Sequence, residues 1–240
     1  MKLLVSPKDM EEAKAVIRGN ADIIDVKNPK EGSLGANFPW IIKSIRALVE
    51  KEKGNGMKIS AAIGDFDYKP GTASLAALGA AVAGAEYIKV GLHKIKTKQE
   101  AIDLLTGVVK AVKDFAPTKK VVSAFYADYK RINSISPFEI TAIGAEVEID
   151  VAMIDTGIKD GKSTLEFLSE EELKTFVLES KALGLLTALA GSLKFEDVSA
   201  IKEIGPDIIG VRGMVCGGNR EDSVRAELVR ELKRMVRGEQ

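Results

Sequence analysis

The sequence is poor in the residue types that carry disulfides, metal clusters and histidine chemistry. Its 240 residues include one cysteine, Cys216, and one histidine, His93. A single cysteine excludes an intramolecular disulfide and a multi-cysteine metal site, and it is typical of proteins in a reducing cytosol. We therefore expect a cytoplasmic protein without a metal site.

The sequence also lacks net charge and long apolar runs. Lysine and arginine together number 35, as do aspartate and glutamate, so the formal net charge is zero. Without an excess of one sign, no long-range field attracts nucleic acid or an anionic membrane, although local charge can hold a phosphorylated metabolite. The run ASLAALGAAVAGA is too short to cross a bilayer, and the start, MKLLVSPKDMEEA, reaches acidic residues before a signal-peptide apolar region forms. We expect a small-molecule substrate and no nucleic-acid or membrane partner.

The chain instead contains a regular alternation of short β-branched runs and longer amphipathic segments. This alternation is the signature of repeated βα units and a parallel sheet. Helix signals support it: SEEELKTFVLESKALG opens with Ser169 as N-cap and stops at Gly184. Eight strands are predicted, over residues 2–6, 22–27, 58–64, 86–91, 120–126, 151–156, 185–191 and 207–213.

The strand count and the chain length together predict the fold class. Eight βα units favour an α/β protein with a single-domain (β/α)8 TIM barrel over residues 1–240, because an open doubly wound sheet usually has fewer strands. The long segment after the second strand is expected to contain a loop over the site and a helix. In such barrels the active site lies at the C-terminal ends of the strands, so polar residues there are the first candidates for chemistry.

Charged side chains stand at the C-terminal ends of three predicted strands. In DIIDVK, Asp25 and Lys27 alternate with apolar residues, so both face the barrel mouth within ion-pair reach of each other. Lys89 in YIKVG faces inward by the same alternation, and MIDTGIKDGKS carries Asp155 and Lys159. Each Lys–Asp pair alone is equally well explained as a structural bridge. Three lysines and two aspartates at one barrel end favour a functional site.

A lysine surrounded by lysines has useful chemistry. Neighbouring positive charge and burial both lower the pKa of the amine, which frees it to attack a carbonyl. The resulting Schiff base is an electron sink, so carbon–carbon bond formation or elimination proceeds without a metal or another cofactor. Lys27 and Lys159 are both suitably placed to form the imine, while Asp25 and Asp155 can move protons or hold the lysines in place.

Small and basic residues follow the last two predicted strands. Barrels often hold phosphate in these two loops, because small residues let backbone N–H groups approach and a helix N-terminus adds partial positive charge. The alternative is that the glycines are ordinary turn formers. The predicted phosphate-binding residues are Gly191, Ser192, Arg212, Gly213, Gly217 and Gly218.

Two further features have competing explanations. His93 follows the fourth predicted strand and is a possible proton shuttle, although a loop histidine is more often merely solvated. The Ala- and Gly-rich helix face at residues 73–85 could pack against a second subunit in a homo-oligomer, but tight packing of the helix on the barrel explains it equally well.

These motifs together resemble a known family. DIIDVKNPKEGSLGA, YIKVGL, MIDTGIKDGKSTLEFL and GVRGMVCGGNR are similar to the motifs of the (5-formylfuran-3-yl)methyl phosphate synthases of methanofuran biosynthesis, formerly called 4-(hydroxymethyl)-2-furancarboxaldehyde phosphate synthases. The similarity spans nearly the whole chain. It implies that two molecules of glyceraldehyde 3-phosphate condense to a phosphorylated furan aldehyde, with loss of one phosphate and two waters.

The resemblance also implies residue roles. Lys27 is the Schiff-base lysine and Asp25 its partner, Lys89 and Lys159 are further active-site lysines, and Asp155 is a proton-transfer residue. Two alternatives stay open. A class I aldolase acting on another sugar phosphate would share the lysines and the phosphate loops, and a non-catalytic phosphometabolite-binding protein would bind its ligand without forming an imine.

Overall fold

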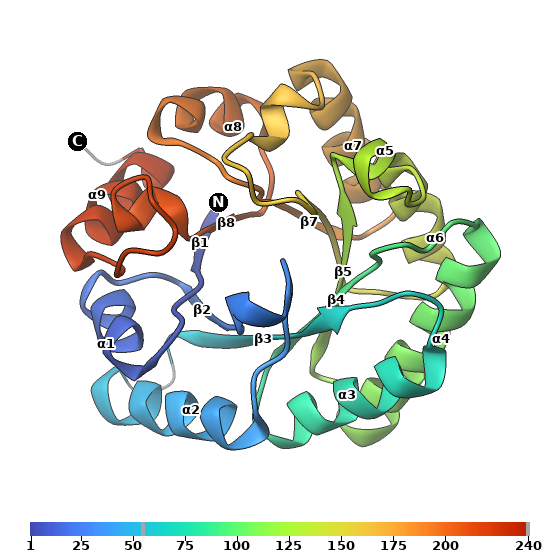
Figure 1. The fold of residues 1–240 in the computed structure, drawn as a ribbon, viewed down its shortest axis with the longest axis horizontal. Helices are drawn as coiled ribbons and strands as arrows, with labels where there is room; N and C mark the ends of the chain where they lie inside the picture. The colour runs from blue at the N-terminus through green and yellow to red at the C-terminus, as the bar shows by residue number, and fades with distance from the viewer. Residues whose placement is uncertain (54–55, 239–240) are drawn as a thin grey trace.

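Eight parallel strands form the centre of the molecule, and the computed structural model describes residues 1–53 and 56–238. The strands are β1 (Lys2–Val5), β2 (Ile23–Val26), β3 (Lys58–Asp65), β4 (Tyr87–Gly91), β5 (Lys120–Tyr126), β6 (Val151–Asp155), β7 (Leu186–Leu189) and β8 (Ile208–Val211). They pair in chain order, and β1 closes the ring by pairing with both β2 and β8 (Figure 1). The predicted (β/α)8 barrel is confirmed.

Helices surround this barrel on the outside (Figure 1). Within the described residues they are α1 (Met10–Arg18), α2 (Pro39–Lys53), α3 (Pro70–Val82), α4 (Lys98–Phe115), α5 (Tyr129–Ile132), α6 (Ile140–Glu146), α7 (Glu170–Ala182), α8 (Val198–Ile204) and α9 (Ala226–Arg237). The predicted N-cap of α7 is confirmed, because the Ser169 hydroxyl accepts from the Glu172 backbone N–H in a capping box. Gly184, just beyond the end of α7, has the positive φ of 79° that favours glycine.

Alternation along the strands separates two apolar cores. Ile24 and Val26 of β2 belong to the core between strands and helices, whereas Ile23 belongs to the core inside the barrel. Asp25 is therefore directed inward, as the sequence predicts. Several strands are shorter than predicted: β2 ends at Val26 rather than at residue 27, so Lys27 is the first residue of the following loop. The polar residues that follow the strands leave the sheet and form the loops of the barrel mouth.

The segment after β2 crosses the barrel mouth before the chain reaches α2 (Figure 1). It contains a short 3-10 helix, η1 (Pro29–Glu31). Leu34 of this segment is completely buried in the apolar core inside the barrel, and the Ser33 hydroxyl donates to the Thr156 carbonyl beyond β6, 3.0 Å away. The predicted loop over the site is thus present, and it covers part of the mouth.

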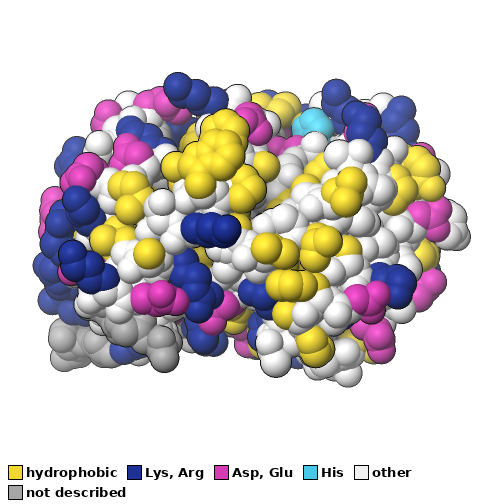
Figure 2. Space-filling view, turned by 90° about the horizontal axis from the view of Figure 1, so that it is seen from below, with side chains coloured by type: hydrophobic (Ala, Val, Ile, Leu, Met, Phe, Trp, Pro, Cys, Tyr) yellow, Lys and Arg dark blue, Asp and Glu magenta, His cyan; other side chains and the backbone are white. Residues whose placement is uncertain are grey.

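The surface carries charges of both signs. Figure 2 shows positive and negative side chains interspersed with apolar ones on the face that it displays. Within α3, Ala73, Ala77 and Ala80 are buried in the core between strands and helices, while Leu75 and Val82 are 74% and 54% exposed. Packing of α3 within the subunit therefore accounts for these small residues, and the homo-oligomer stays a prediction. Among the described residues, none of the helices has the length and apolarity needed to span a bilayer.

Candidate active site

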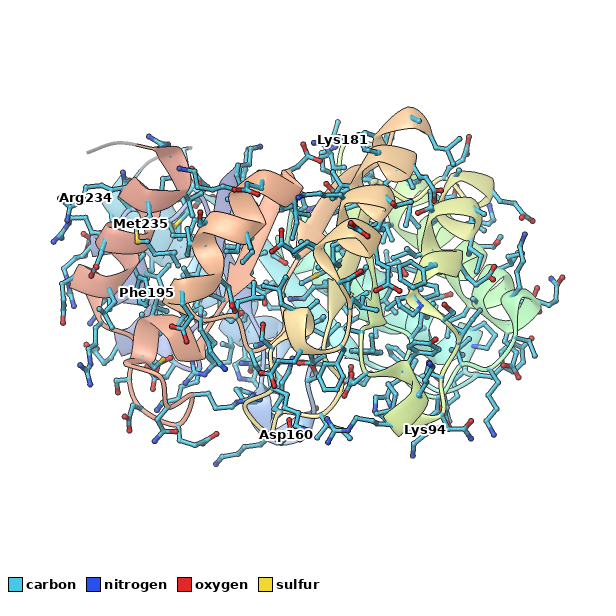
Figure 3. All side chains as sticks on the ribbon, turned by 90° about the horizontal axis from the view of Figure 1, so that it is seen from above. Lys94, Asp160, Lys181, Phe195, Arg234 and Met235 are labelled. Carbon is cyan, nitrogen blue, oxygen red and sulfur yellow. The ribbon has the colours of Figure 1, made fainter. Side chains whose placement is uncertain are left out.

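A large cavity opens among the loops that follow the strands. Figure 3 shows Asp160 and Lys94, from the loops after β6 and β4, at this end of the barrel, and Lys181 of α7 at the opposite end. The cavity has a volume of about 760 Å³. Among the predicted site residues, those that line it are Lys27, Lys89, Asp155, Lys159, Gly191, Ser192, Arg212, Gly213, Gly217 and Gly218.

Asp25 lies below the cavity floor, inside the barrel. Its carboxylate accepts hydrogen bonds from Lys89 Nζ at 2.7 Å, from the Ser60 hydroxyl at 2.7 Å and from the Ser6 hydroxyl at 2.8 Å. Burial alone would raise the pKa of Asp25, but the positive charges of Lys89 and Lys27 outweigh it and lower that pKa. Asp25 is therefore an ionised carboxylate with three donors.

The predicted ion pair between Asp25 and Lys27 is not formed. Within the described residues, the ion pair of Asp25 is with Lys89. Lys27 begins the loop after β2, and its amine contacts the Ser33 backbone carbonyl at 3.4 Å. The prediction was wrong because two residues on the same strand face are separated along the strand by about 6.6 Å of rise, whereas a neighbouring strand brings an amine directly alongside.

Asp155 and Lys159 form the second pair, as the sequence predicts. Lys159 Nζ lies 2.5 Å from Asp155 Oδ1 and 3.1 Å from the Thr156 hydroxyl. Asp155 also accepts from the Thr156 backbone N–H at 2.7 Å. Burial would raise the pKa of Asp155, but the charges of Lys159 and Lys27 outweigh it and lower that pKa. This aspartate is an ionised group on the cavity wall.

Lys27 differs from the other two lysines in its electrostatic surroundings. Its side chain is buried, and burial is the largest cause that lowers its pKa, to about 7. The charges of Lys89 and Lys159 act in the same direction, and those of Asp155 and Asp25 oppose them. At neutral pH about half of the Lys27 amines are therefore uncharged, and an uncharged amine can attack a carbonyl carbon.

The loops after β7 and β8 form the other side of the cavity. Gly191 has a positive φ of 99°, and a Cβ there would come within 2.8 Å of the Thr156 backbone nitrogen, so only glycine fits. Gly217 and Gly218 have successive positive φ values of 83° and 97° and end the short helix η5 (Gly213–Cys216). Glycines of both loops thus line the cavity, where their backbone N–H groups can approach a phosphate closely.

Arg212 has a different environment from the one predicted. Its guanidinium is buried and donates to Glu12 at 2.7 Å, to the Ser6 carbonyl at 2.8 Å and to the Arg220 carbonyl at 2.9 Å. These bonds tie the loop after β8 to α1 and to the end of β1. The side chain therefore supports the glycine loop, and its charge is balanced by Glu12. Arg212 also lines the cavity, and its contact with a phosphate stays a prediction.

Sequence reasoning missed three residues of the site. Arg225, the N-cap residue of α9, lines the cavity, and its guanidinium lies so close to Gly217 that a Cβ there would be 2.9 Å from Nη2. Within residues 1–53 and 56–238 its guanidinium has no hydrogen-bond or ion-pair partner. Nothing in its sequence context distinguishes it from a surface arginine. Ser6 and Ser60, by contrast, follow from strand alternation, since both face inward next to Asp25.

His93 stands apart from the cavity. It is not among the lining residues, and its ring makes an edge-to-face contact with the Tyr126 ring, with centroids 5.7 Å apart. Among the described residues there is also no group of three histidine, cysteine, aspartate or glutamate side chains placed to hold a metal ion.

The protein is a closed (β/α)8 barrel, and buried lysines and aspartates gather at its C-terminal end. This is the architecture of a (β/α)8-barrel enzyme. Solved structures support this fold: 3-hexulose-6-phosphate synthase from Salmonella typhimurium aligns with a TM-score of 0.67 at 18% identity, covering 100% of both chains. Thiamine phosphate pyrophosphorylase from Pyrococcus furiosus aligns with a TM-score of 0.61 at 16% identity, over 99% of this chain and 96% of that one. At such identities the likeness shows the fold alone.

The particular family follows from the sequence comparisons. A family model described as 4-HFC-P synthase matches residues 3–233, and the chain belongs to this family. Over 233 residues it is 63% identical to a (5-formylfuran-3-yl)methyl phosphate synthase of Methanosarcina mazei, covering 97% of each chain. Over 239 residues it is 54% identical to the synthase of the same name from Methanocaldococcus jannaschii, covering 99% of this chain and 100% of that one. The resemblance expected from the motifs is thus confirmed.

Proposed function

We propose that this protein condenses two molecules of glyceraldehyde 3-phosphate to 4-(hydroxymethyl)-2-furancarboxaldehyde phosphate, in methanofuran biosynthesis, through a Schiff base on Lys27. Membership of the 4-HFC-P synthase family supports the product. The observation that carries the mechanism is the difference among the lysines: Lys89 and Lys159 are bound to carboxylates, whereas among the described residues the Lys27 amine donates to the Ser33 carbonyl and forms no ion pair.

The first step is attack of the uncharged Lys27 amine on the aldehyde carbon of one triose phosphate. Water leaves, and the resulting iminium withdraws electrons from C2 and acidifies its proton. Asp155, ionised and held by Lys159 on the cavity wall, accepts this proton. The electron pair then forms the enamine.

The enamine next expels the phosphate from C3, and Lys159 is placed to neutralise the departing oxygen. The three-carbon fragment that remains on Lys27 joins the second triose phosphate, whose phosphate lies against Gly191, Ser192 and Gly218, with Arg225 supplying charge. Condensation and ring closure release two waters. Imine formation releases one further water, which hydrolysis of the product imine consumes, so six carbons, one phosphate ester and one free phosphate account for both substrates.

The test is incubation of the purified protein with glyceraldehyde 3-phosphate alone, following furan absorbance and released phosphate. A parallel sample is trapped with borohydride, and the adduct is mapped by mass spectrometry. Furan and phosphate in equal amounts, with the adduct on Lys27, are the expected result. An adduct without furan would instead indicate an aldolase for another sugar phosphate, and binding with neither signal would indicate a non-catalytic phosphometabolite-binding protein.

A further inference from the structure

Three residues from separate elements meet beside the loop that crosses the barrel mouth. The Tyr126 hydroxyl at the end of β5 donates a short hydrogen bond to Oδ1 of Asp65 at the end of β3. The other oxygen of Asp65 accepts from the Leu34 backbone N–H at 2.9 Å. One carboxylate thus connects two strands of the barrel to the crossing loop.

The surrounding backbone is shaped to admit this cluster. At Gly91 of β4, any Cβ would collide with the Tyr126 hydroxyl and would lie 2.6 Å from Asp65 Oδ1 and 3.0 Å from Leu34 Cδ1. At Gly32, which has a φ of 136°, a Cβ would collide with Asp65 Oδ2. Two glycines from different elements therefore leave room for the same hydrogen bonds. Tyr126 itself is 1% exposed, so the hydroxyl is not a surface contact.

Tyr126 acts in this cluster as a hydrogen-bond donor. Burial is the main cause that raises the pKa of Tyr126 well above its usual value, and the charge of Asp65 adds to it. The hydroxyl therefore stays protonated, and neither Tyr126 nor Asp65 lines the cavity in which the proposed chemistry takes place. The pair acts on the site through the loop that it holds.

That loop contacts the imine-forming lysine directly. Leu34 is held by Asp65 and buried in the barrel interior, and the preceding residue, Ser33, presents its carbonyl to the Lys27 amine. The Ser33 hydroxyl is fixed separately, on the Thr156 carbonyl. The loop is thus anchored at Ser33 and Leu34, beside the carbonyl that contacts the buried Lys27 amine.

We propose that Tyr126 and Asp65 are positioning residues for Lys27, because their hydrogen bond holds the crossing loop in the place where it shields and orients the amine. This inference rests on the proposed function. It assigns the pair no contact with substrate. It implies that loss of the Tyr126 hydroxyl changes the reactivity of Lys27 without changing any charged group around it.

The charged groups that face Lys27 come from three places. Asp25 comes from β2, Lys89 comes from β4, and Asp155 with Lys159 comes from β6 and the loop after it. The Tyr126→Phe change leaves all four in place. A shift in the titration of Lys27 in that variant would therefore report a change in its burial.

The experiment measures the rate of borohydride-trapped adduct at Lys27 across pH 5 to 10, together with KM and kcat, in the wild type and in Tyr126→Phe. We expect the pH midpoint to rise by about one unit and the trapping rate at pH 7 to fall about fivefold, because a less buried amine has a pKa nearer to that of a free lysine. The Asp65→Asn variant should shift the pH midpoint in the same direction. The double variant should shift it little further, since both substitutions disrupt the same hydrogen bond between Tyr126 and Asp65.

Tyr87→Phe is the matched control. Tyr87 also faces the barrel interior, but it lines a separate cavity at the opposite end, next to Met1 and Asp207. Loss of the Tyr87 hydroxyl should leave the pH midpoint of trapping at Lys27 unchanged. Wild-type trapping with an unchanged midpoint in both Tyr126→Phe and Asp65→Asn would overturn the inference while leaving the proposed function intact. Absence of any Lys27 adduct in the wild type would overturn both. If Tyr126→Phe does not fold, Asp65→Asn decides alone.

Discussion

Lys89 Nζ and Asp25 Oδ2 lie 2.7 Å apart in the barrel interior, where the two side chains are 2% and 0% exposed. This pair holds one of the three lysines of the site as a charged, hydrogen-bonded group. Its positive charge is also the second largest cause, after burial, that lowers the pKa of Lys27. The neighbour of the reactive amine is therefore itself fixed by a carboxylate.

Breaking this pair from one side should destabilise the protein strongly. The Asp25→Ala change leaves the Lys89 ammonium buried without its partner, and we expect the free energy of unfolding to fall by about 3 to 5 kcal/mol. Urea unfolding followed by circular dichroism measures it. Asp114→Ala is the control, because Asp114 pairs with Lys110 on the exposed face of α4, and no clear change is expected there. Equal effects of the two substitutions would contradict a structural role for the buried pair.

Imine formation should depend on pH through Lys27. Below pH 7 the amine is mostly protonated and unreactive, and above it the uncharged form predominates, so the trapping rate should rise through about pH 7 and then level off. Stopped samples reduced with borohydride at each pH give this profile. A midpoint near pH 10, the value of an ordinary lysine, would show that burial does not activate this amine.

The same lowered pKa of Lys27 also predicts how the stability of the protein depends on pH. Because the pKa of Lys27 is about 7 when folded and near 10.5 when unfolded, the unfolded chain binds more protons between these values. This residue therefore makes the protein more stable as pH rises from 7 towards 10.5. Removing the amine in Lys27→Met should weaken that rise, which thermal melts of the variant and the wild type across this window would measure. Parallel pH profiles for the two proteins would contradict the lowered pKa.

Substitutions of Lys27 and Lys159 should show which of these two lysines forms the imine. Lys159→Ala should still give a borohydride adduct, at a reduced rate, because in the proposed mechanism Lys159 holds Asp155 in place and does not form the imine. Lys27→Ala should give none. The reverse pattern would move the imine to Lys159 and leave the rest of the site unchanged.

Arg225 should contribute to substrate binding more than to turnover. Removing a charged donor from a phosphate costs about 1.5 kcal/mol, so Arg225→Ala should raise KM about tenfold with little change in kcat. Steady-state kinetics with glyceraldehyde 3-phosphate measure both constants. Arg234→Ala, on α9 and away from the cavity, is the control and should change neither (Figure 3). An unchanged KM in Arg225→Ala would place the phosphate elsewhere.

Much of this arrangement could be predicted from the sequence. The alternation of β-branched runs with amphipathic segments specifies eight βα units, and the barrel follows because a parallel strand needs a crossover helix and buries both of its faces. The same alternation puts Lys89 and Asp155 at strand ends inside the barrel, and both line the cavity. Spacing along the chain was sufficient to predict the pair of Asp155 and Lys159, since these residues are four positions apart.

The partner of Asp25 could not be predicted in this way. It depends on the register of three neighbouring strands: Asp25 is paired with Ser60, and Ala62, two residues further along β3, is paired with Lys89. The different surroundings of Arg212 and Arg225 could not be predicted from the sequence for the same reason. Both follow β8, but only the folded loop shows that Glu12 of α1 neutralises the first and that the second lies over Gly217.

The sequence by itself determined the barrel, the end of the barrel at which charge gathers, and the family, because these depend on periodicity and on motifs read within one stretch of chain. The tertiary structure alone decided which lysine of the site pairs with Asp25, which arginine pairs with Glu12, and how Asp65 connects Tyr126 to the Leu34 backbone. Each of these depends on side chains far apart in sequence, whose distances are set by closure of the sheet and by the path of the loops across its mouth.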